Sequence, residues 1–369
     1  MDRQGMNLQG LTHELSLYLE SRFREGLWAS SVAGWSLVLC FGAAYTCYYF
    51  SSIAKKPQLV TGSESFGQFL QDHCPVVTET YYPTVWCWEG RVQTLLRPFI
   101  TSQPYVQYRN ELIAAKDGGQ ISLDWFDNHD STRYPDSSTR PTILLLPGLT
   151  GTSRESYILH MIQQSKALGY SMLLLNYLGK IGRETPLKAA AIFSAGWNAF
   201  ESADSLEKPV NWLLFNYYLT TCLRSSVTSN NLFFSYINFT NTVLTEDLNL
   251  NSVLQAKTIR EFDKQFTSVM FGYSTIDDYY ADASPCHRLK RIGIPVLCLN
   301  SLDDVFSPNH AIPVEMAKQN PNVALILTSY GGHIGFLEGL WPRKCTYMDR
   351  VFKQFVQAVF EHGSKIINI

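Results

Sequence analysis

The stretch from Thr142 to Gly151, TILLLPGLTG, decides the fold class of this chain. It is a short, unbroken apolar run that ends at Pro147-Gly148, which is typical of a parallel β-strand covered on both faces. Thr152 to Glu155 match a capping box, in which the threonine and glutamate side chains satisfy free N–H groups at a helix start. An apolar helical face follows, and Gly169 suits the C-cap. The sequence here predicts a strand, a turn and a helix.

The same alternation continues toward the C-terminus. Three further apolar runs predict buried strands, at Ala189–Ser194, Ile294–Asn300 and Val323–Thr328. A last helix is predicted from the apolar stripe between Val351 and Phe360. Because strands alternate with helices, we predict an α/β protein with a mainly parallel sheet and helices on both of its faces.

The part of the chain before this alternation is more varied. Residues 111–125 alternate apolar and polar positions around Asp117-Gly118-Gly119, which predicts a β-hairpin. The aromatic block from Tyr81 to Pro98 predicts an irregular segment packed across a domain. Residues 55–80 predict a polar linker, so the folded domain is expected over residues 81–369.

No charged residue occurs from Gly26 to Ala54. This stretch is longer than the ~20 residues that cross a bilayer core, and its tryptophan and tyrosines cluster toward its ends, where they favour the membrane interface. It follows a mixed-charge tail over residues 1–25, unlike a cleaved signal peptide. The sequence predicts one uncleaved transmembrane anchor over residues 26–54; the alternative is a buried apolar helix.

The orientation of this anchor is not fixed by charge, because two basic residues flank each side. The sequon Asn238-Phe239-Thr240, if it is glycosylated, favours a lumenal C-terminal part. The expectation is therefore a single-pass type II membrane protein, for which the endoplasmic reticulum is one location.

Composition limits the possible partners and cofactors. The chain has 369 residues, 46% of them apolar, and a net charge of -2, which suits one enzyme-sized core and gives no sign of a nucleic-acid partner. Its eight cysteines form no Cys-x-x-Cys pair and no Cys/His cluster at metal-ligand spacing. We predict no metal, no diffusible cofactor and no particular protein partner.

Two of the predicted strands are followed by residues suited to catalysis. Asp303-Asp304 follows the strand at 294–300, and His333 follows the strand at 323–328. An acid and then a histidine near the C-terminus is the order in the α/β-hydrolase triad. A buried carboxylate fixes the tautomer of such a histidine and stabilises its protonated form. The alternative is structural: the aspartates cap a turn, and the histidine is satisfied within a loop.

Several blocks of the sequence resemble the AB-hydrolase superfamily 4 group, a lipase and esterase branch of the α/β-hydrolases. They are PTVWCWEGRVQTLLRP, ILLLPGLTGTSRESYI, MLLLNYLGKIG, FTSVMFGYSTIDDYYADASP, IPVLCLNSLDDVFSP and TSYGGHIGFLEG. The resemblance implies an α/β-hydrolase domain with a lid-like region over residues 197–285. It also implies a membrane-bound serine hydrolase that cleaves acyl esters of phospholipids with medium-length or oxidatively shortened chains.

The resemblance further implies roles for three residues. Asp304, four residues before Pro308, matches the triad acid, and His333 matches the triad base. Leu149 matches the residue whose backbone N–H helps to bind the oxyanion.

The nucleophile of that family is missing here. The family places a strand and the turn Gly-x-Ser-x-Gly before a helix that begins MLLLNYLGK, so about 50 residues of its pattern are absent between Tyr170 and Met172. No Gly-x-Ser-x-Gly occurs anywhere in the chain; half-matches end in Ser36, Ser153, Ser171 and Ser274. Only Ser171 stands at the start of the expected helix, although Leu173 replaces the second glycine. Ser171 is therefore the one weak candidate nucleophile.

Two function hypotheses remain. The first is a membrane-bound phospholipase or carboxylesterase with a Ser-Asp-His triad. The second, which we favour for this chain, is a non-catalytic form: a lipid-binding pseudoenzyme or an unstable splice product, because no acyl-enzyme forms without an attacking hydroxyl.

The sheet is expected to lack a central strand. A further departure from the family is the long segment Val227–Asn251, rich in Asn, Ser and Thr.

Overall fold

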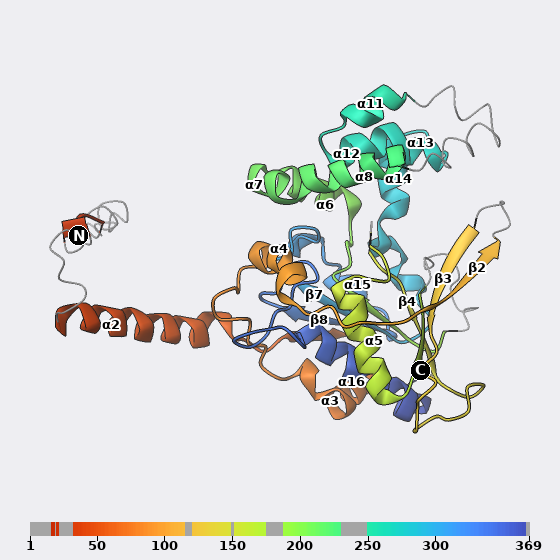
Figure 1. Ribbon diagram of the computed structural model, residues 1–369, viewed down its shortest axis with the longest axis horizontal. Helices are drawn as coiled ribbons and strands as arrows, with labels where there is room; N and C mark the ends of the chain where they lie inside the picture. Colours follow the sequence, from red (N-terminus) through yellow and green to blue (C-terminus); the bar gives the residue numbers. More distant parts are fainter. Residues whose placement is uncertain are drawn as a thin grey trace. The chain divides into compact units, whose positions relative to one another are not determined.

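A computed structural model describes residues 16–18, 20–21, 32–114, 120–148, 151–174, 187–229 and 249–366. The chain divides into two compact units, one up to Ala54 and one from Lys55 onward. In the first unit, α2 (Val32–Tyr48) continues into a π-helical turn, η1 (Tyr49–Ile53) (Figure 1). Trp35–Ile53 is long and apolar enough to cross a membrane, judged by length and composition. This is consistent with the predicted membrane anchor.

Residues 55–80 belong to the folded unit and are not the polar linker that we predicted. They form β1 (Gln58–Thr61), α3 (Glu64–His73) and the 3-10 turn η2 (Pro75–Val77). β1 pairs antiparallel with β8 (Val323–Thr328) at the edge of a sheet. The polar composition misled the prediction because these short elements expose one side to water, while Val60 and Leu70 are buried on the other side.

The aromatic block also contains a helix that we did not predict. α4 (Gly90–Ile100) begins after Glu89, whose carboxylate accepts the N–H of Val92 as an N-cap. The prediction of irregular structure is correct only for residues 81–89, which form turns and isolated bridges.

The strands that the structure describes in the folded unit form two four-stranded sheets. Their orders are β2-β3-β5-β4 and β1-β8-β7-β6. The remaining bounds are β2 (Arg109–Ala114), β3 (Gln120–Phe126), β4 (Thr142–Leu145), β5 (Ser171–Leu174), β6 (Ala190–Phe193) and β7 (Val296–Ser301). β2 and β3 form the predicted hairpin, whose turn at Asp117-Gly118-Gly119 lies outside the described residues. The four predicted apolar strands are confirmed as β4, β6, β7 and β8.

β5 corrects the prediction that one helix leads directly into another at Ser171. Residues 171–174 form a strand that pairs antiparallel with β3 and parallel with β4, in the register Thr142↔Ser171. A run as short as SMLL does not distinguish helix from strand by its period. Pairing on both edges and full burial of Met172 outweigh the helix propensity of Met and Leu. The rest of the expected helix, residues 175–186, lies outside the described residues.

Helices cover both faces of the second sheet. Leu297 and Leu299 of β7 face one core cluster, which contains residues of α3, α5 (Ser156–Leu168) and α16 (Tyr347–His362). Val296 and Cys298 face the other cluster, which contains Trp197 and residues near α15 (Val314–Ala317). β7 is therefore buried along its whole length, as a strand covered on both faces must be.

Helix ends differ in part from the predictions. Glu155 is the N-cap residue of α5, but its side chain makes no capping bond, so the predicted capping box does not form. The Thr152 hydroxyl instead accepts the N–H of Arg154, one residue before the N–H of Glu155 that a capping box would use. Gly169 does cap the helix in the left-handed conformation, with φ of 86°. The predicted C-terminal helix is confirmed as α16, which carries a complete capping box at Thr346 and Asp349.

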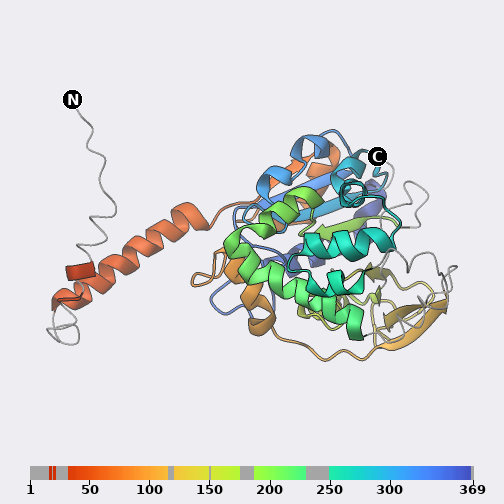
Figure 2. The ribbon, with the colours of Figure 1, turned by 90° about the horizontal axis from the view of Figure 1, so that it is seen from above.

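The lid-like region is helical in its described part. Figures 1 and 2 show its helices grouped over one side of the sheets. They are α6 (Ala199–Glu207), α7 (Pro209–Asn211), η3 (Trp212–Asn216), α8 (Tyr217–Ser229), α11 (Leu250–Gln255), α12 (Ile259–Phe262), η4 (Asp263–Thr267), α13 (Ser268–Met270) and α14 (Ile276–Ala283), here called the cap helices. The short turns η5 (Pro285–Arg291), η6 (Asn309–Ala311) and η7 (Gly363–Lys365) complete the unit. The sequon at Asn238 and most of Val227–Asn251 lie outside the described residues.

Candidate active site

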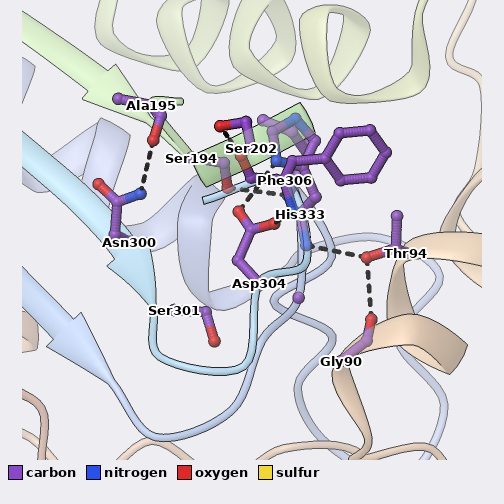
Figure 3. Close-up of polar contacts among 12 residues, drawn as sticks. Gly90, Thr94, Ser194, Ala195, Ser202, Asn300, Ser301, Asp304, Phe306 and His333 are labelled. Atoms are coloured by element: carbon purple, nitrogen blue, oxygen red, sulfur yellow. Dashed lines mark hydrogen bonds and ion pairs between the residues drawn. The ribbon is translucent and has the colours of Figure 1, made fainter. Parts of the chain in front are cut away.

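Asp304 and His333 meet after the carboxyl ends of β7 and β8. An oxygen of the buried Asp304 carboxylate lies 2.9 Å from Nδ1 of His333 (Figure 3). The other carboxylate oxygen accepts the N–H of Phe306 at 2.8 Å, which fixes the orientation of the carboxylate. A carboxylate at Nδ1 holds the proton on that nitrogen and leaves Nε2 free to accept one. The pair predicted from the order of residues along the chain is therefore assembled in space.

The loop that carries His333 is held against α4. The backbone N–H of His333 donates to the Thr94 hydroxyl at 2.8 Å, and that hydroxyl donates to the Gly90 carbonyl oxygen at 2.8 Å. Gly332 has φ of 59°, and a side chain there would collide with the same carbonyl oxygen. The Phe306 ring packs on the imidazole with centroids 4.4 Å apart. These contacts fix both the position and the plane of the imidazole ring.

Asp303 has a different task from its neighbour. Its carboxylate accepts hydrogen bonds from the N–H of Gly332, at 2.9 Å, and from the hydroxyl of Ser301. The bond to Gly332 fixes the loop that carries His333. Burial raises the pKa of Asp303 to about 6, against the lowering by these two hydrogen bonds. Of the two adjacent aspartates, only Asp304 contacts the imidazole, in line with the assignment implied by family resemblance.

His333 opens onto a cavity of about 970 Å³. Its walls come from β4, β6, α5 and α16, together with cap helices such as α6 and α14. Most lining side chains are apolar. Asp263 is an exception in this wall, and its burial raises the pKa of the carboxyl group. The arrangement joins the Asp304–His333 pair to a mostly apolar cavity of the size of a small-molecule site.

Ser194 is a residue of this site that sequence reasoning missed. It follows β6, is only 4% exposed and has the uncommon backbone φ of 52° for a serine. Its hydroxyl oxygen accepts the N–H of Ile334 at 2.9 Å, and Ser194 lines the same cavity as His333. The signal in the sequence was its place at the end of a predicted strand. Across the residues that the structure describes, no side-chain hydroxyl or thiol is hydrogen-bonded to Nε2 of His333.

Ser171 lies away from this pair. It is the first residue of β5, at the amino end of the strand, whereas Asp304 and His333 follow carboxyl ends. Its hydroxyl donates to the Asp127 carbonyl oxygen at 3.1 Å, and it does not line the cavity. Ser36 lies in the α2 helix of the other unit, and Ser153 and Ser274 also lie outside the cavity wall. Leu149, the expected oxyanion residue, lies outside the described residues.

In the described ranges, no group of three or more His, Cys, Asp or Glu side chains could hold a metal ion.

A carboxylate and histidine pair after parallel strands, on a sheet covered by helices, is the arrangement found in the α/β-hydrolase class. The chain is 62% identical to phospholipase ABHD3 of Homo sapiens over 419 residues, which covers 99% of this chain and 100% of that protein. Identity to phospholipase ABHD3 of Bos taurus is also 62%, with 99% of each chain covered. This chain belongs to the family of phospholipase ABHD3, so the membership predicted from its motifs is confirmed.

More distant comparisons add less. Monoacylglycerol lipase ABHD2 of Homo sapiens is 22% identical over 85% of this chain and 88% of its own length. Among solved structures, the esterase Pf2001 of Pyrococcus furiosus has a TM-score of 0.33 and 15% identity, covering 71% of this chain and 97% of that chain. A TM-score this low adds nothing to the assignment of the fold. No family model matches the chain.

The alignments with the ABHD3 relatives are longer than this chain. They span 419 positions against 369 residues, so at least 50 aligned positions have no residue here. This is the size of the segment expected to be missing from the family pattern. Its location between Tyr170 and Met172 stays a prediction.

Proposed function

We propose that this chain is a non-hydrolysing form of the phospholipase fold, with its acid and base assembled but without the attacking hydroxyl. One observation carries the proposal. Asp304 holds Nδ1 of His333, while within the described residues no hydroxyl or thiol is bonded to Nε2. A base without a nucleophile has no route to an acyl-enzyme. In the family as a whole, we expect a Ser-Asp-His triad that hydrolyses acyl esters of phospholipids.

Phospholipid is the ligand that we propose for this chain. The name of the ABHD3 relatives and the apolar walls of the cavity beside His333 support this choice. The apolar helix Trp35–Ile53 would keep the chain at a lipid surface. We expect medium-length or oxidatively shortened acyl chains to lie against the cap helices, with the ester near His333.

A second candidate function is hydrolysis through Ser194. The observation that favours it is the left-handed backbone of Ser194 at a strand end beside His333, since a nucleophilic serine of this fold also sits on a strained turn after a strand. Against it, none of the hydrogen bonds of the described residues joins the Ser194 hydroxyl to His333; its oxygen accepts the N–H of Ile334.

Fluorophosphonate labelling of the full chain in membranes separates the two functions. We expect no labelling of the chain itself or of its Ser171→Ala and Ser194→Ala variants. A chain with the missing segment of phospholipase ABHD3 inserted serves as the positive control. Labelling of the unmodified chain that disappears in Ser194→Ala, and in His333→Ala, would establish the second function and overturn the first. Labelling lost in Ser171→Ala would make Ser171 the nucleophile.

We further propose a type II orientation in the endoplasmic reticulum, with the hydrolase unit in the lumen. The sequon at Asn238 supports it, because only a lumenal site is glycosylated. In microsomes, we expect the chain to gain one glycan that endoglycosidase removes, and Asn238→Gln to migrate without it. A chain with no glycan whose hydrolase unit is digested by added protease would instead have the unit on the cytosolic side.

A further inference from the structure

Among the residues that the structure describes, two strand edges inside the folded unit have no partner strand. There, β4 ends one sheet and pairs with β5 alone, and β6 ends the other sheet and pairs with β7 alone. Both edges line the cavity described above, with Thr142 to Leu145 on one side and Ala190 to Phe193 on the other. We call the part of the cavity between these two strands the strand gap. An edge of this kind normally lies at the outside of a sheet, where water or another element satisfies it.

The ladder bonds show which backbone groups face the strand gap. In parallel pairing, the N–H and C=O of one residue point to one side of the strand, and those of the next residue point to the other side. Ala190 donates to the residue before β7 at 2.9 Å, and Ser194 donates to Leu299 of β7 at 2.8 Å. The backbone groups of Ala191 and Phe193 therefore point into the gap. Pro141 accepts from Ser171 of β5 at 3.0 Å, so those of Thr142 and Leu144 point into the gap from the other side.

The faces of the gap are apolar. Met161 of α5 and Phe352 and Phe355 of α16 line the cavity on one face, and Leu206 of α6 lines it from the cap helices. β7 already lies in surroundings of this kind, because it is paired on both edges and covered on both faces. Its sequence, VLCLNS, begins with four apolar residues. An occupant that satisfies both the edges and the faces is therefore an extended chain with a run of apolar side chains.

We propose that the strand gap binds an extended apolar peptide segment of another polypeptide, which pairs with β4 and β6 at once. This is strand addition, with an edge on each side of the guest. An acyl chain would fill the same apolar space but would leave the N–H and C=O groups of both strands without partners. Backbone pairing thus favours peptide over lipid. The proposal does not depend on whether the chain hydrolyses esters.

The test is a binding experiment with the full chain in phosphatidylcholine nanodiscs. The probe is a fluorescein-labelled synthetic peptide with five central valines and two lysines at each end. The matched control is the same peptide with alternate valine amides N-methylated, which keeps its apolar surface but removes the donors toward one strand. We expect saturable binding, seen as fluorescence anisotropy and absent with empty nanodiscs, and a loss of roughly tenfold or more in affinity for the methylated peptide.

A protein variant checks the site itself. Ala191→Pro removes an N–H that faces the gap but keeps the bond from Ala190 to Pro295, so it should weaken the probe several-fold with little change in melting temperature. If this variant unfolds, the two peptides still decide the question. Equal affinity for both peptides, with displacement by dioctanoylphosphatidylcholine, would identify the gap as a lipid cavity and overturn the proposal. Absence of saturable binding would overturn it as well.

Discussion

A chain in which the missing segment of phospholipase ABHD3 is inserted between Tyr170 and Ser171 is expected to hydrolyse a short-chain phospholipid on the order of 10⁶-fold faster than the present chain. The reason is that the acid and the base are already in place. Asp304 lies 2.9 Å from His333, and the loop that carries the histidine is fixed by Thr94 and Gly332. Only the step that forms the acyl-enzyme lacks its attacking group.

Release of fatty acid from dioctanoylphosphatidylcholine measures this gain. In the restored chain, His333→Ala should abolish turnover, and Asp304→Asn should reduce it by roughly 10⁴-fold because the imidazole tautomer is lost. The same two substitutions in the present chain should change nothing above background. Turnover of the present chain that matches the restored chain and depends on His333 would refute the non-hydrolysing form.

Asp349→Ala is expected to lower the free energy of unfolding by about 3–5 kcal/mol. The Asp349 carboxylate is buried at the start of α16, where one oxygen accepts the N–H and the hydroxyl of Thr346 at 2.8 and 2.9 Å. The same oxygen lies 3.2 Å from Nδ1 of His160, which is also fully buried. Removal of the carboxylate would leave these donors in the core without an acceptor.

Chemical denaturation of the full chain in detergent micelles would measure this loss. The matched control is Asp72→Ala, which removes an exposed carboxylate that accepts only from Gln68 one turn away. Its effect should stay within about 0.5 kcal/mol. Equal free energies of unfolding for the two variants would mean that the buried His160–Asp349 pair does not stabilise the fold.

The parts of the fold that the sequence predicted are those where local pattern and burial agree. β7 and β8 were recognised because a strand covered on both faces must be apolar at every position, and this leaves a continuous run. The pairing of Asp304 with His333 could be predicted because the ends of neighbouring parallel strands meet at one edge of a sheet.

The parts that it did not predict depend on partners far away in the chain. Residues 171–174 become β5 because β3 and β4 offer edges on both sides, which no window of the local sequence records. Ser194 likewise reaches the site through a distant partner, because its hydroxyl oxygen accepts the N–H of Ile334, 140 residues later. The family resemblance therefore predicted a helix in the first case, and in the second the sequence offered only the place of Ser194 at the end of a predicted strand.

The pairing of β1 with β8 has a consequence for the order of folding during synthesis. Thr61 pairs with Ala324, so β1 leaves the ribosome more than 260 residues before its partner. The cost of closing so long a loop must be met before any of these bonds form, and contacts of this range slow folding. The segment that directly follows the apolar helix therefore stays unpaired until translation has passed β8. A chain interrupted before Val323 would keep its apolar helix but could not complete the sheet that β1 belongs to.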